Sequence, residues 1–172
     1  MNSSETKSDI IFLIGFMGAG KTTIGKEIAA QRNLHFVDLD SVIEFQEDKS
    51  IAEIVMEKGI EYFRKKESEL LKAMDLDNVI VACGGGTPCF FDNLEWMKSR
   101  GKVVFVNTSF ESIFSRLKGS DISKRPLLKN IKPAELKEQL HLLYTERLPI
   151  YQQATISFDP IKEQLSDLLL DN

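Results

Sequence analysis

Near its N-terminus the sequence carries a motif that binds phosphate groups. Residues 15–22 follow the pattern G-x-x-x-x-G-K-[ST], which ends in Gly20, Lys21 and Thr22. Glycines let the backbone wrap so tightly that several N–H groups can point at nucleotide phosphates. Lys21 adds a positive charge near the β- and γ-phosphates, and Thr22 offers a hydroxyl to Mg²⁺. The motif therefore predicts nucleotide binding and phosphoryl transfer.

The segments on either side of this loop fit the same interpretation. Residues 10–14 are an unbroken apolar run, which is typical of a fully buried parallel strand. Residues 22–30 have helical spacing, with Ile24 and Ile28 on one face. The phosphates are then expected at a helix N-terminus, where the helix dipole favours anions. The alternative, a purely structural glycine turn, does not require this order of strand, loop and helix.

The elements that must position this loop can be predicted from the rest of the chain. Further apolar runs predict strands over 35–37, 79–83, 103–106 and 155–158. Helical patterns separate them over 51–58, 62–74, 93–99, 110–118 and 133–147, with a last helix from 159. Capping boxes at Ser50–Glu53 and Thr108–Glu111 and a first-turn Pro133 predict three of the helix starts. This order predicts one domain over 1–172, a three-layer α/β/α sandwich with a five-stranded parallel sheet.

Composition limits the partners of the protein. The 172 residues are 42% hydrophobic and 28% charged, and the formal net charge is −4. This charge implies no general affinity for nucleic acid or for anionic membranes. The first nine residues lack the apolar core of a signal peptide, and no apolar stretch reaches the roughly 18–20 residues of a membrane span. We therefore expect a cytoplasmic protein.

One stretch does not fit the sandwich pattern. Residues 116–132 hold six basic residues against one acidic residue, in an otherwise acidic protein: Arg116, Lys118, Lys124, Arg125, Lys129 and Lys132 against Asp121. Such a segment is either a solvated loop or a lid that closes over an anion. Beside a phosphate-binding loop the lid is favoured, because phosphoryl transfer needs water to be excluded.

Two carboxylates follow the second predicted strand. Asp38 and Asp40 lie on the same side of that strand if it extends so far, at the strand end that faces the ligand crevice in open α/β sheets. One carboxylate can hold Mg²⁺ through water, and the other can orient or deprotonate an acceptor hydroxyl. The alternative is that Asp40 only caps the next helix. In phosphate-loop NTPases the corresponding strand often ends in an aspartate. The strand over 79–83 lacks this residue, so Asp38 is the candidate for supporting the metal.

Glycines and arginines complete the set of candidate residues. Gly84, Gly85 and Gly86 expose backbone N–H groups, which suits close approach by a small ligand. Arg147 continues an apolar helical stripe, and Arg64 lies near the start of the predicted 62–74 helix. An arginine on an inward face needs an anionic partner, which is either a ligand or an Asp or Glu of the protein itself.

Together these motifs resemble the shikimate kinases, which are small-metabolite kinases with a phosphate-binding loop and a nucleoside monophosphate kinase-like fold. The resemblance runs from residue 10 to about 160. The matching segments are Gly15–Gly25, Phe36–Asp40, Phe63–Glu67, Gly84–Gly86, Arg125–Leu128 and Arg147–Tyr151. The usual Gly-Glu pair before the arginine motif appears as Gly59-Ile60, with Glu61 displaced by one position. The rival interpretation is another small-metabolite kinase of the same fold, such as a gluconate kinase.

The resemblance implies a reaction and its phosphate site. These enzymes transfer the γ-phosphoryl group of ATP to the 3-hydroxyl of shikimate, on the pathway to chorismate and aromatic amino acids. Lys21 would contact the transferred group, and Thr22 would bind Mg²⁺ with Asp38 supporting the metal through water. The residues that cradle the phosphates would be Gly18, Ala19, Gly20, Lys21, Thr22 and Thr23.

The resemblance also implies a substrate site and a mobile lid. Asp40 would bind substrate hydroxyls and act as the base. Two arginines and two glycines would hold the shikimate carboxylate: Arg64, Arg147, Gly85 and Gly86. Within a lid over about 116–130, Arg125 would move onto the phosphates as a catalytic residue, and Arg116 would lie against adenine. A segment over about 38–67 would bind shikimate, and a monomer is expected.

Overall fold

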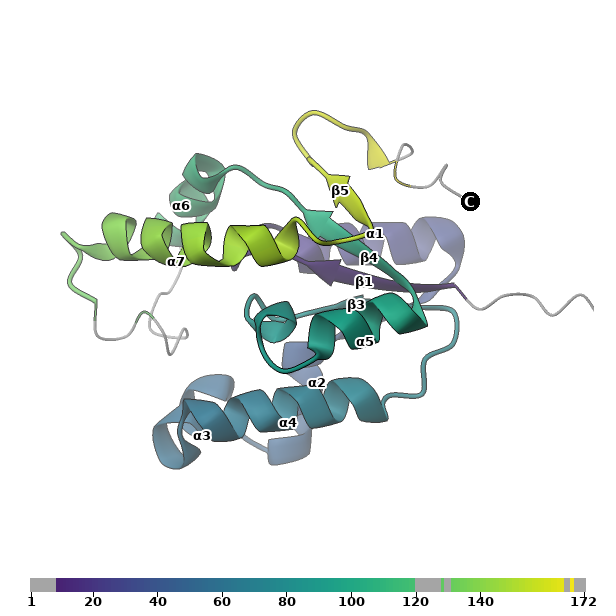
Figure 1. The fold of residues 1–172 in the computed structure, drawn as a ribbon, viewed down its shortest axis with the longest axis horizontal. Helices are drawn as coiled ribbons and strands as arrows, with labels where there is room; N and C mark the ends of the chain where they lie inside the picture. Colours follow the sequence, from purple (N-terminus) through teal and green to yellow (C-terminus); the bar gives the residue numbers. More distant parts are fainter. Residues whose placement is uncertain (1–8, 120–127, 129–130, 166–167, 169–172) are drawn as a thin grey trace, which may run out of the picture.

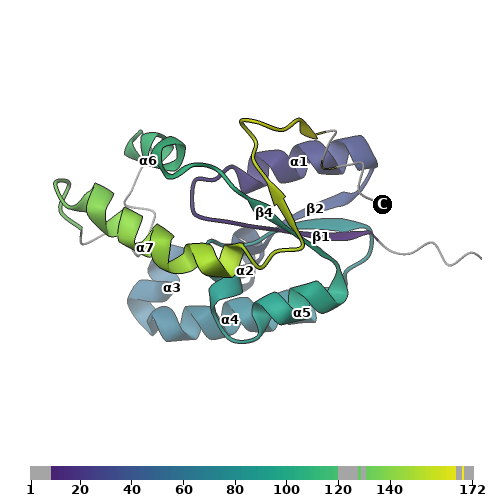
Figure 2. The ribbon, with the colours of Figure 1, turned by 45° about the horizontal axis from the view of Figure 1, so that its top comes forward.

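A computed structural model describes residues 9–119, 128, 131–165 and 168. These residues form three layers, with one sheet between two layers of helices (Figure 1). Five parallel strands pair in the order β2-β3-β1-β4-β5. The strands are β1 (Ile10–Ile14), β2 (His35–Asp38), β3 (Val79–Ala82), β4 (Lys102–Val106) and β5 (Ile156–Phe158). Helix α1 (Lys21–Arg32) lies on one side of the sheet and α5 (Asn93–Arg100) on the other (Figure 2). The predicted α/β/α sandwich with a five-stranded parallel sheet is confirmed.

The remaining helices follow the sequence pattern with some differences. They are α2 (Leu39–Glu47), α3 (Ile51–Lys58), α4 (Ile60–Ala73), the short 3₁₀ helix η1 (Thr87–Cys89), α6 (Phe110–Lys118) and α7 (Leu136–Tyr151). Strand β1 is buried along its whole length, as expected for the centre of a parallel sheet. The capping box at Ser50 and Glu53 is present. Helix α2 was not predicted as a separate element, although Leu39 and Ile43, four residues apart and both buried, are the signal for it.

Two predicted helix starts are wrong. Ser109, and not Thr108, caps α6, because the buried Thr108 hydroxyl donates instead to the carbonyl oxygen of Ala19 at 2.8 Å. Pro133 lies in a turn, and α7 begins only at Leu136. Helix α7 also runs past Arg147 to Tyr151 despite Pro149. This proline lies near the helix end, so few hydrogen bonds depend on its missing N–H group.

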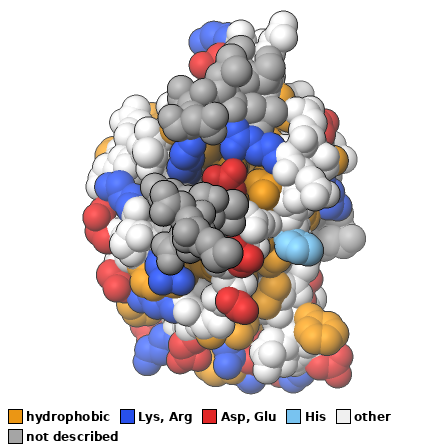
Figure 3. Space-filling model, turned by 90° about the vertical axis from the view of Figure 1, so that its right-hand side faces the viewer, with side chains coloured by type: hydrophobic (Ala, Val, Ile, Leu, Met, Phe, Trp, Pro, Cys, Tyr) orange, Lys and Arg blue, Asp and Glu red, His pale blue; other side chains and the backbone are white. Residues whose placement is uncertain are grey.

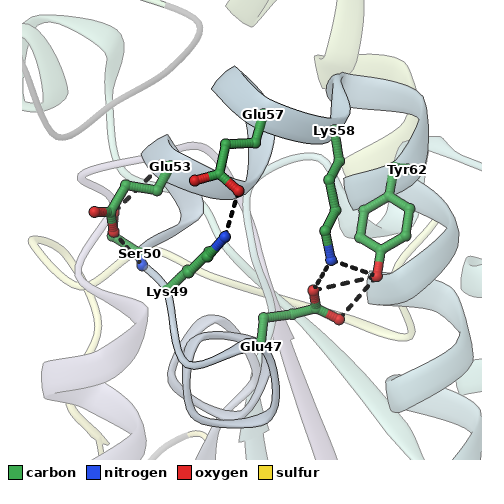
Figure 4. Close-up of polar contacts among 7 residues, drawn as sticks. All are labelled: Glu47, Lys49, Ser50, Glu53, Glu57, Lys58 and Tyr62. Atoms are coloured by element: carbon green, nitrogen blue, oxygen red, sulfur yellow. Dashed lines mark hydrogen bonds and ion pairs between the residues drawn. The ribbon is translucent and has the colours of Figure 1, made fainter.

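Helices α2, α3 and α4 are tied to one another by polar contacts (Figure 4). Glu47 at the end of α2 accepts hydrogen bonds from Lys58 of α3 at 2.6 Å and from the Tyr62 hydroxyl of α4 at 2.9 Å. Lys49 pairs with Glu57 of α3. The segment that was predicted to bind shikimate, residues 38–67, is thus held together by its own side chains.

Charge on the surface is mixed. On the face shown in Figure 3, acidic, basic and hydrophobic side chains are interspersed. Among the described residues, no helix has the length and apolar character needed to cross a membrane.

Candidate active site

The phosphate-binding loop joins β1 to α1 and is shaped by side chains that bind its carbonyl oxygens. Lys21 Nζ donates to the carbonyl oxygens of Gly15 at 2.8 Å and Phe16 at 2.9 Å. Arg116 Nη1 donates to the carbonyl oxygens of Gly18 and Ala19, both at 3.2 Å. Thr108, which follows the C-terminal end of β4, bonds the carbonyl oxygen of Ala19 as well. The loop is therefore held in shape at the N-terminus of α1, where anions are favoured.

A cavity of about 620 Å³ opens beside this loop and brings distant parts of the chain together. From the loop it is lined by Met17, Gly18, Ala19, Gly20, Lys21, Thr22, Thr23 and Ile24. From elsewhere it is lined by Asp38, Asp40, Ala82, Cys83, Gly84, Gly85, Arg116, Leu117 and Pro160. The predicted phosphate residues and the acidic pair thus share one cavity. Leu117 and Pro160 were not predicted as site residues, because neither carries a chemical signal in the sequence.

Asp38 occupies the junction of β2 and α2. Its Oδ1 accepts the backbone N–H of Asp40 at 3.1 Å and so caps α2, while its Oδ2 accepts the Thr22 hydroxyl at 2.8 Å. The alternative in which Asp40 caps the helix is therefore wrong. The two carboxylates meet because a helix begins directly after β2, and not because the strand continues to residue 40.

Asp40 has an unusual electrostatic environment. Burial, followed by the nearby carboxylates of Glu67 and Asp38, raises the pKa of Asp40 from the usual 3.8 to about 6. The charges of Lys21 and Arg64 act in the opposite direction. A carboxylate with this pKa is ionised at neutral pH and is a better proton acceptor than an ordinary aspartate.

Close packing explains the glycines that follow β3. A Cβ atom at Gly84 would lie 2.8 Å from Glu67 Oε1 and 2.9 Å from Asp40 Oδ1, which is too close for any side chain. A Cβ atom at Gly86 would lie 2.5 Å from Arg64 Nη2. The glycines thus let acidic and basic side chains of α2 and α4 lie directly against the backbone.

Arg64 is buried and held on three sides. Its Nη1 donates to the fully buried Glu67 Oε2 at 2.7 Å, and its guanidinium lies 4.9 Å from the ring centre of Phe63 and 4.6 Å from that of Phe90. Its Nε is buried and has no hydrogen-bond partner among the described residues. The alternative of an acidic partner within the protein is therefore present as the Arg64–Glu67 salt bridge, but the Nε donor of Arg64 takes no part in it. The roles of Glu67 and Phe90 were not predicted; for Glu67, the spacing of three residues from Arg64 on a helix was the available signal.

Arg147 is the second buried arginine of this region. Its Nη1 has no hydrogen-bond partner among the described residues, although the side chain is only 6% exposed. One turn further along α7, the Tyr151 hydroxyl donates to the carbonyl oxygen of Gly85 at 2.6 Å, which ties this end of α7 to the glycines. Burial raises the pKa of Cys89, and the charges of both Arg147 and Arg64 act to lower it, so the two guanidinium groups share one neighbourhood.

Both arginines have the chemistry to hold an anion. A buried cation with an unused donor is costly unless a negative group completes its hydrogen bonds. Arg64, Arg147 and Gly86 do not line the cavity itself. Glu67 bonds Arg64 and lies with Asp40 against Gly84, so it connects Arg64 to the cavity. Arg125 lies outside the described residues. Glu61, the displaced glutamate, is exposed in the first turn of α4, and Glu67 holds Arg64 instead.

The comparisons with known proteins agree with this geometry. The family model for shikimate kinase matches residues 17–169. The shikimate kinase of Parabacteroides distasonis is 41% identical over 155 residues, which cover 88% of each chain. A crystal structure of shikimate kinase from Bacteroides thetaiotaomicron superposes with a TM-score of 0.85 at 36% identity, covering 95% of this chain and 99% of that chain. Shikimate kinase from Acinetobacter baumannii in complex with shikimate gives 0.84 at 31% identity, covering 95% and 89%.

The family match decides between the two interpretations that the sequence left open. It favours shikimate over gluconate as the acceptor, and it makes the protein an enzyme of the shikimate pathway. The family model spans residues 17–169, a range that includes most of the phosphate loop and both buried arginines. From its motifs, its fold and these matches, we conclude that this chain belongs to the shikimate kinase family.

Proposed function

We propose that this enzyme transfers the γ-phosphoryl group of ATP to the 3-hydroxyl of shikimate in the cavity beside the phosphate loop, with the help of Mg²⁺. Membership of the family implies the use of ATP. One observation carries the proposal: a single cavity connects the phosphate loop to Asp40, and Glu67 links this cavity to the buried Arg64. In the part of the chain that the structure describes, Arg64 and Arg147 each have one buried donor without a partner.

The phosphates of ATP bind along the loop at the N-terminus of α1. Backbone N–H groups from Gly18 to Thr23 and the charge of Lys21 receive them. Arg116, which already contacts the loop, borders the adenine end of the cavity together with Leu117 and Pro160.

Thr22 and Asp38 fit a magnesium site. Their oxygen atoms are 2.8 Å apart at the edge of the cavity, and Mg²⁺ prefers one or two protein oxygens together with phosphate and water oxygens. When bound, Mg²⁺ neutralises charge on the β- and γ-phosphates.

Shikimate is a carboxylate with three hydroxyl groups, and the site offers a partner for each kind of group. The carboxylate binds Arg64 and Arg147, whose unused donors it satisfies, with the backbone of Gly85 and Gly86 close by. Asp40 accepts the hydrogen bond of the reacting hydroxyl. The relative from Acinetobacter baumannii, solved with shikimate, supports this assignment of the substrate.

The reaction then needs one proton transfer and one displacement. The 3-oxygen of shikimate attacks the γ-phosphorus while Asp40 takes up the hydroxyl proton, and the bond to the bridging oxygen breaks to release ADP. Lys21 stabilises the negative charge on the transferred group. Arg125, which lies outside the described residues, would supply a second cation. The chain acts as one monomeric cytoplasmic domain.

Product analysis tests the proposal. Incubation with ATP, Mg²⁺ and shikimate is expected to give ADP and one phosphorylated product, with phosphorus–proton NMR coupling at carbon 3. Gluconate and nucleoside monophosphates serve as rival acceptors, and EDTA removes the metal. Coupling at another carbon, or turnover that continues in EDTA, would overturn the corresponding part of the proposal.

The pH dependence of the reaction follows from Asp40. A base must be deprotonated, so kcat/KM for shikimate should fall about tenfold per pH unit below a pKa near 6 and level off above pH 7. An ordinary aspartate would keep activity down to about pH 4. A rate profile between pH 4.5 and 8.5, with nucleotide saturating, distinguishes the two cases. The Asp40→Asn variant, at its residual rate, should lack the inflection near pH 6.

Gly86→Ala tests the packing against Arg64. The backbone of Gly86 has φ −94°, which alanine also adopts, so the only new feature is a Cβ atom placed 2.5 Å from Arg64 Nη2. We expect a rise of about tenfold or more in KM for shikimate, since Arg64 must leave its place between Glu67 and the two rings. The affinity for ADP, measured by calorimetry, should not change. A variant with normal KM would show that Arg64 tolerates the displacement.

A further inference from the structure

A closed ring of buried hydrogen bonds joins α4, η1 and α5. Thr87 of η1 donates its hydroxyl to Glu67 Oε1 at 2.6 Å, and the side-chain amide of Asn93 donates to the carbonyl oxygen of Thr87 at 2.9 Å. Ser68 donates its hydroxyl to Asn93 Oδ1 at 2.6 Å. Since Ser68 follows Glu67 in α4, the ring returns to the helix on which it begins. Glu67, Thr87 and Asn93 are each 0% exposed.

Burying this ring of polar groups costs more free energy than filling the same space with apolar side chains. Buried polar groups cost free energy unless every one of them is paired, and apolar side chains of similar size often stabilise a fold at least as well. What polar groups add is a fixed geometry. Glu67 has both carboxylate oxygens occupied, Oε1 by Thr87 and Oε2 by Arg64. A carboxylate held at both oxygens cannot rotate, so the guanidinium that it binds is held in one orientation.

The Thr87 hydroxyl also lies at the edge of the reaction site. A Cβ atom at Gly84 would lie 3.1 Å from Thr87 Oγ1, in addition to its short distances to Glu67 and Asp40. Three oxygen atoms therefore gather over one glycine. The hydroxyl is placed where it can hold Glu67 in position beside Asp40 and Arg64 without blocking the cavity, because Thr87 does not line it.

We propose that Thr87 is a positioning residue for shikimate. Its hydroxyl fixes Glu67, and Glu67 in turn fixes Arg64 in the orientation that receives the substrate carboxylate. Asn93 and Ser68 keep Thr87 in place from the side of α5. This inference rests on the proposed role of Arg64 in binding that carboxylate. Thr87 acts through Arg64 and not on the reacting atoms.

Two substitutions of Thr87 test the proposal. Valine has nearly the shape of threonine but cannot donate a hydrogen bond, whereas serine keeps the hydroxyl. Thr87→Val should raise Kd and KM for shikimate about ten- to hundredfold, the effect of losing one hydrogen bond to a charged group. The Kd for ADP should stay unchanged, and kcat should change less than KM. Thr87→Ser should return shikimate affinity to within a few-fold of the unmodified enzyme.

Calorimetric titrations with shikimate and with ADP, on both variants, separate the possible outcomes. Thr145→Val is the matched control, because Thr145 is exposed on α7 and bonds only its own helix at His141. Normal shikimate affinity in Thr87→Val, or an equal loss for shikimate and ADP, overturns the positioning role. Arg64→Ala is measured beside them. If it keeps shikimate affinity, the proposed carboxylate site itself is wrong; if it loses affinity while Thr87→Val does not, only the inference about Thr87 fails.

A second variant covers the case in which Thr87→Val does not fold. Ser68→Ala opens the ring at its far end and leaves Thr87 and Glu67 in place. It should raise the Kd for shikimate by a few-fold, with ADP binding unchanged, since one neutral hydrogen bond is lost. Unchanged shikimate affinity in Ser68→Ala would show that the ring does not act on Arg64.

Discussion

Asp40→Asn is expected to lower kcat by about 10²- to 10⁴-fold, the contribution of a general base. Asparagine has the same size and still accepts a hydrogen bond from a hydroxyl, but it cannot take up the proton. Nucleotide binding should survive, because Asp38 and not Asp40 contacts Thr22 of the phosphate loop. Steady-state rates with shikimate, together with the Kd for ADP, measure both effects.

Stability provides an independent measurement on the same variant. The pKa of Asp40 is higher in the folded protein, about 6, than in an unfolded chain, about 3.8, so the folded state binds more protons between these values. The free energy of unfolding therefore falls as pH rises from about 4 to 6, and the cost at pH 8 is at most about 3 kcal/mol. Asp40→Asn removes this cost. Urea unfolding at pH 8 should show a variant that is more stable by about 1–3 kcal/mol although it is nearly inactive.

Asp48→Asn is the matched control for these measurements. Asp48 ends the same helix, α2, but is exposed and does not line the cavity. Its substitution should change neither kcat nor the pH dependence of unfolding. Near-normal turnover in Asp40→Asn would remove Asp40 from the mechanism as a base, and a less stable variant would contradict its electrostatic environment.

Arg147→Ala is expected to reduce kcat/KM for shikimate by about 30- to 1,000-fold, which corresponds to about 2–4 kcal/mol of transition-state binding. The side chain is buried, and its free Nη1 has no partner among the described residues. A substrate carboxylate would accept the hydrogen bond that this Nη1 group can donate. Most of the loss should therefore appear in the affinity for shikimate, and little in that for ADP.

Two further substitutions sharpen this result. Arg147→Lys keeps the charge but loses the planar pair of donors, so it should restore only a part of the activity. Arg100→Ala removes an exposed arginine that lies over the Trp96 ring on α5, and it should leave kcat/KM unchanged. An Arg147→Ala enzyme with unaltered kcat/KM for shikimate would refute the carboxylate site.

Local patterns predicted much of this protein. The phosphate loop could be recognised because its geometry depends on residues adjacent in the chain, and each buried strand appeared as a short apolar run. The Ser50–Glu53 capping box is also a contact between near neighbours, and it is present. By contrast, the Thr108–Glu111 pattern has the same form, but the hydroxyl bonds Ala19, which is 89 positions away in the chain. Nothing within four residues of Thr108 could indicate that partner.

Asp38 and Asp40 also show what local sequence can predict and what depends on distant contacts. The sequence placed Asp38 and Asp40 together at the end of a strand, but it left open whether Asp40 only capped the following helix. Only the arrangement of β2 against the phosphate loop made Asp38 the cap and the partner of Thr22, and put Asp40 next to Glu67. The pKa of Asp40 depends on that burial and on those neighbours, so no property of residues 36–40 alone could predict it.

By itself, the sequence determined the order of elements, the fold class, the phosphate loop and the identities of the candidate arginines, because these depend on residue type and short-range spacing. The tertiary structure decided which of these groups meet. It set Glu67 and Thr87 against Gly84, left one donor on each of Arg64 and Arg147 without a partner among the described residues, and placed Leu117 and Pro160 at the cavity. Such contacts arise where helices from distant parts of the chain pack on one sheet, and their distances are set by that packing alone.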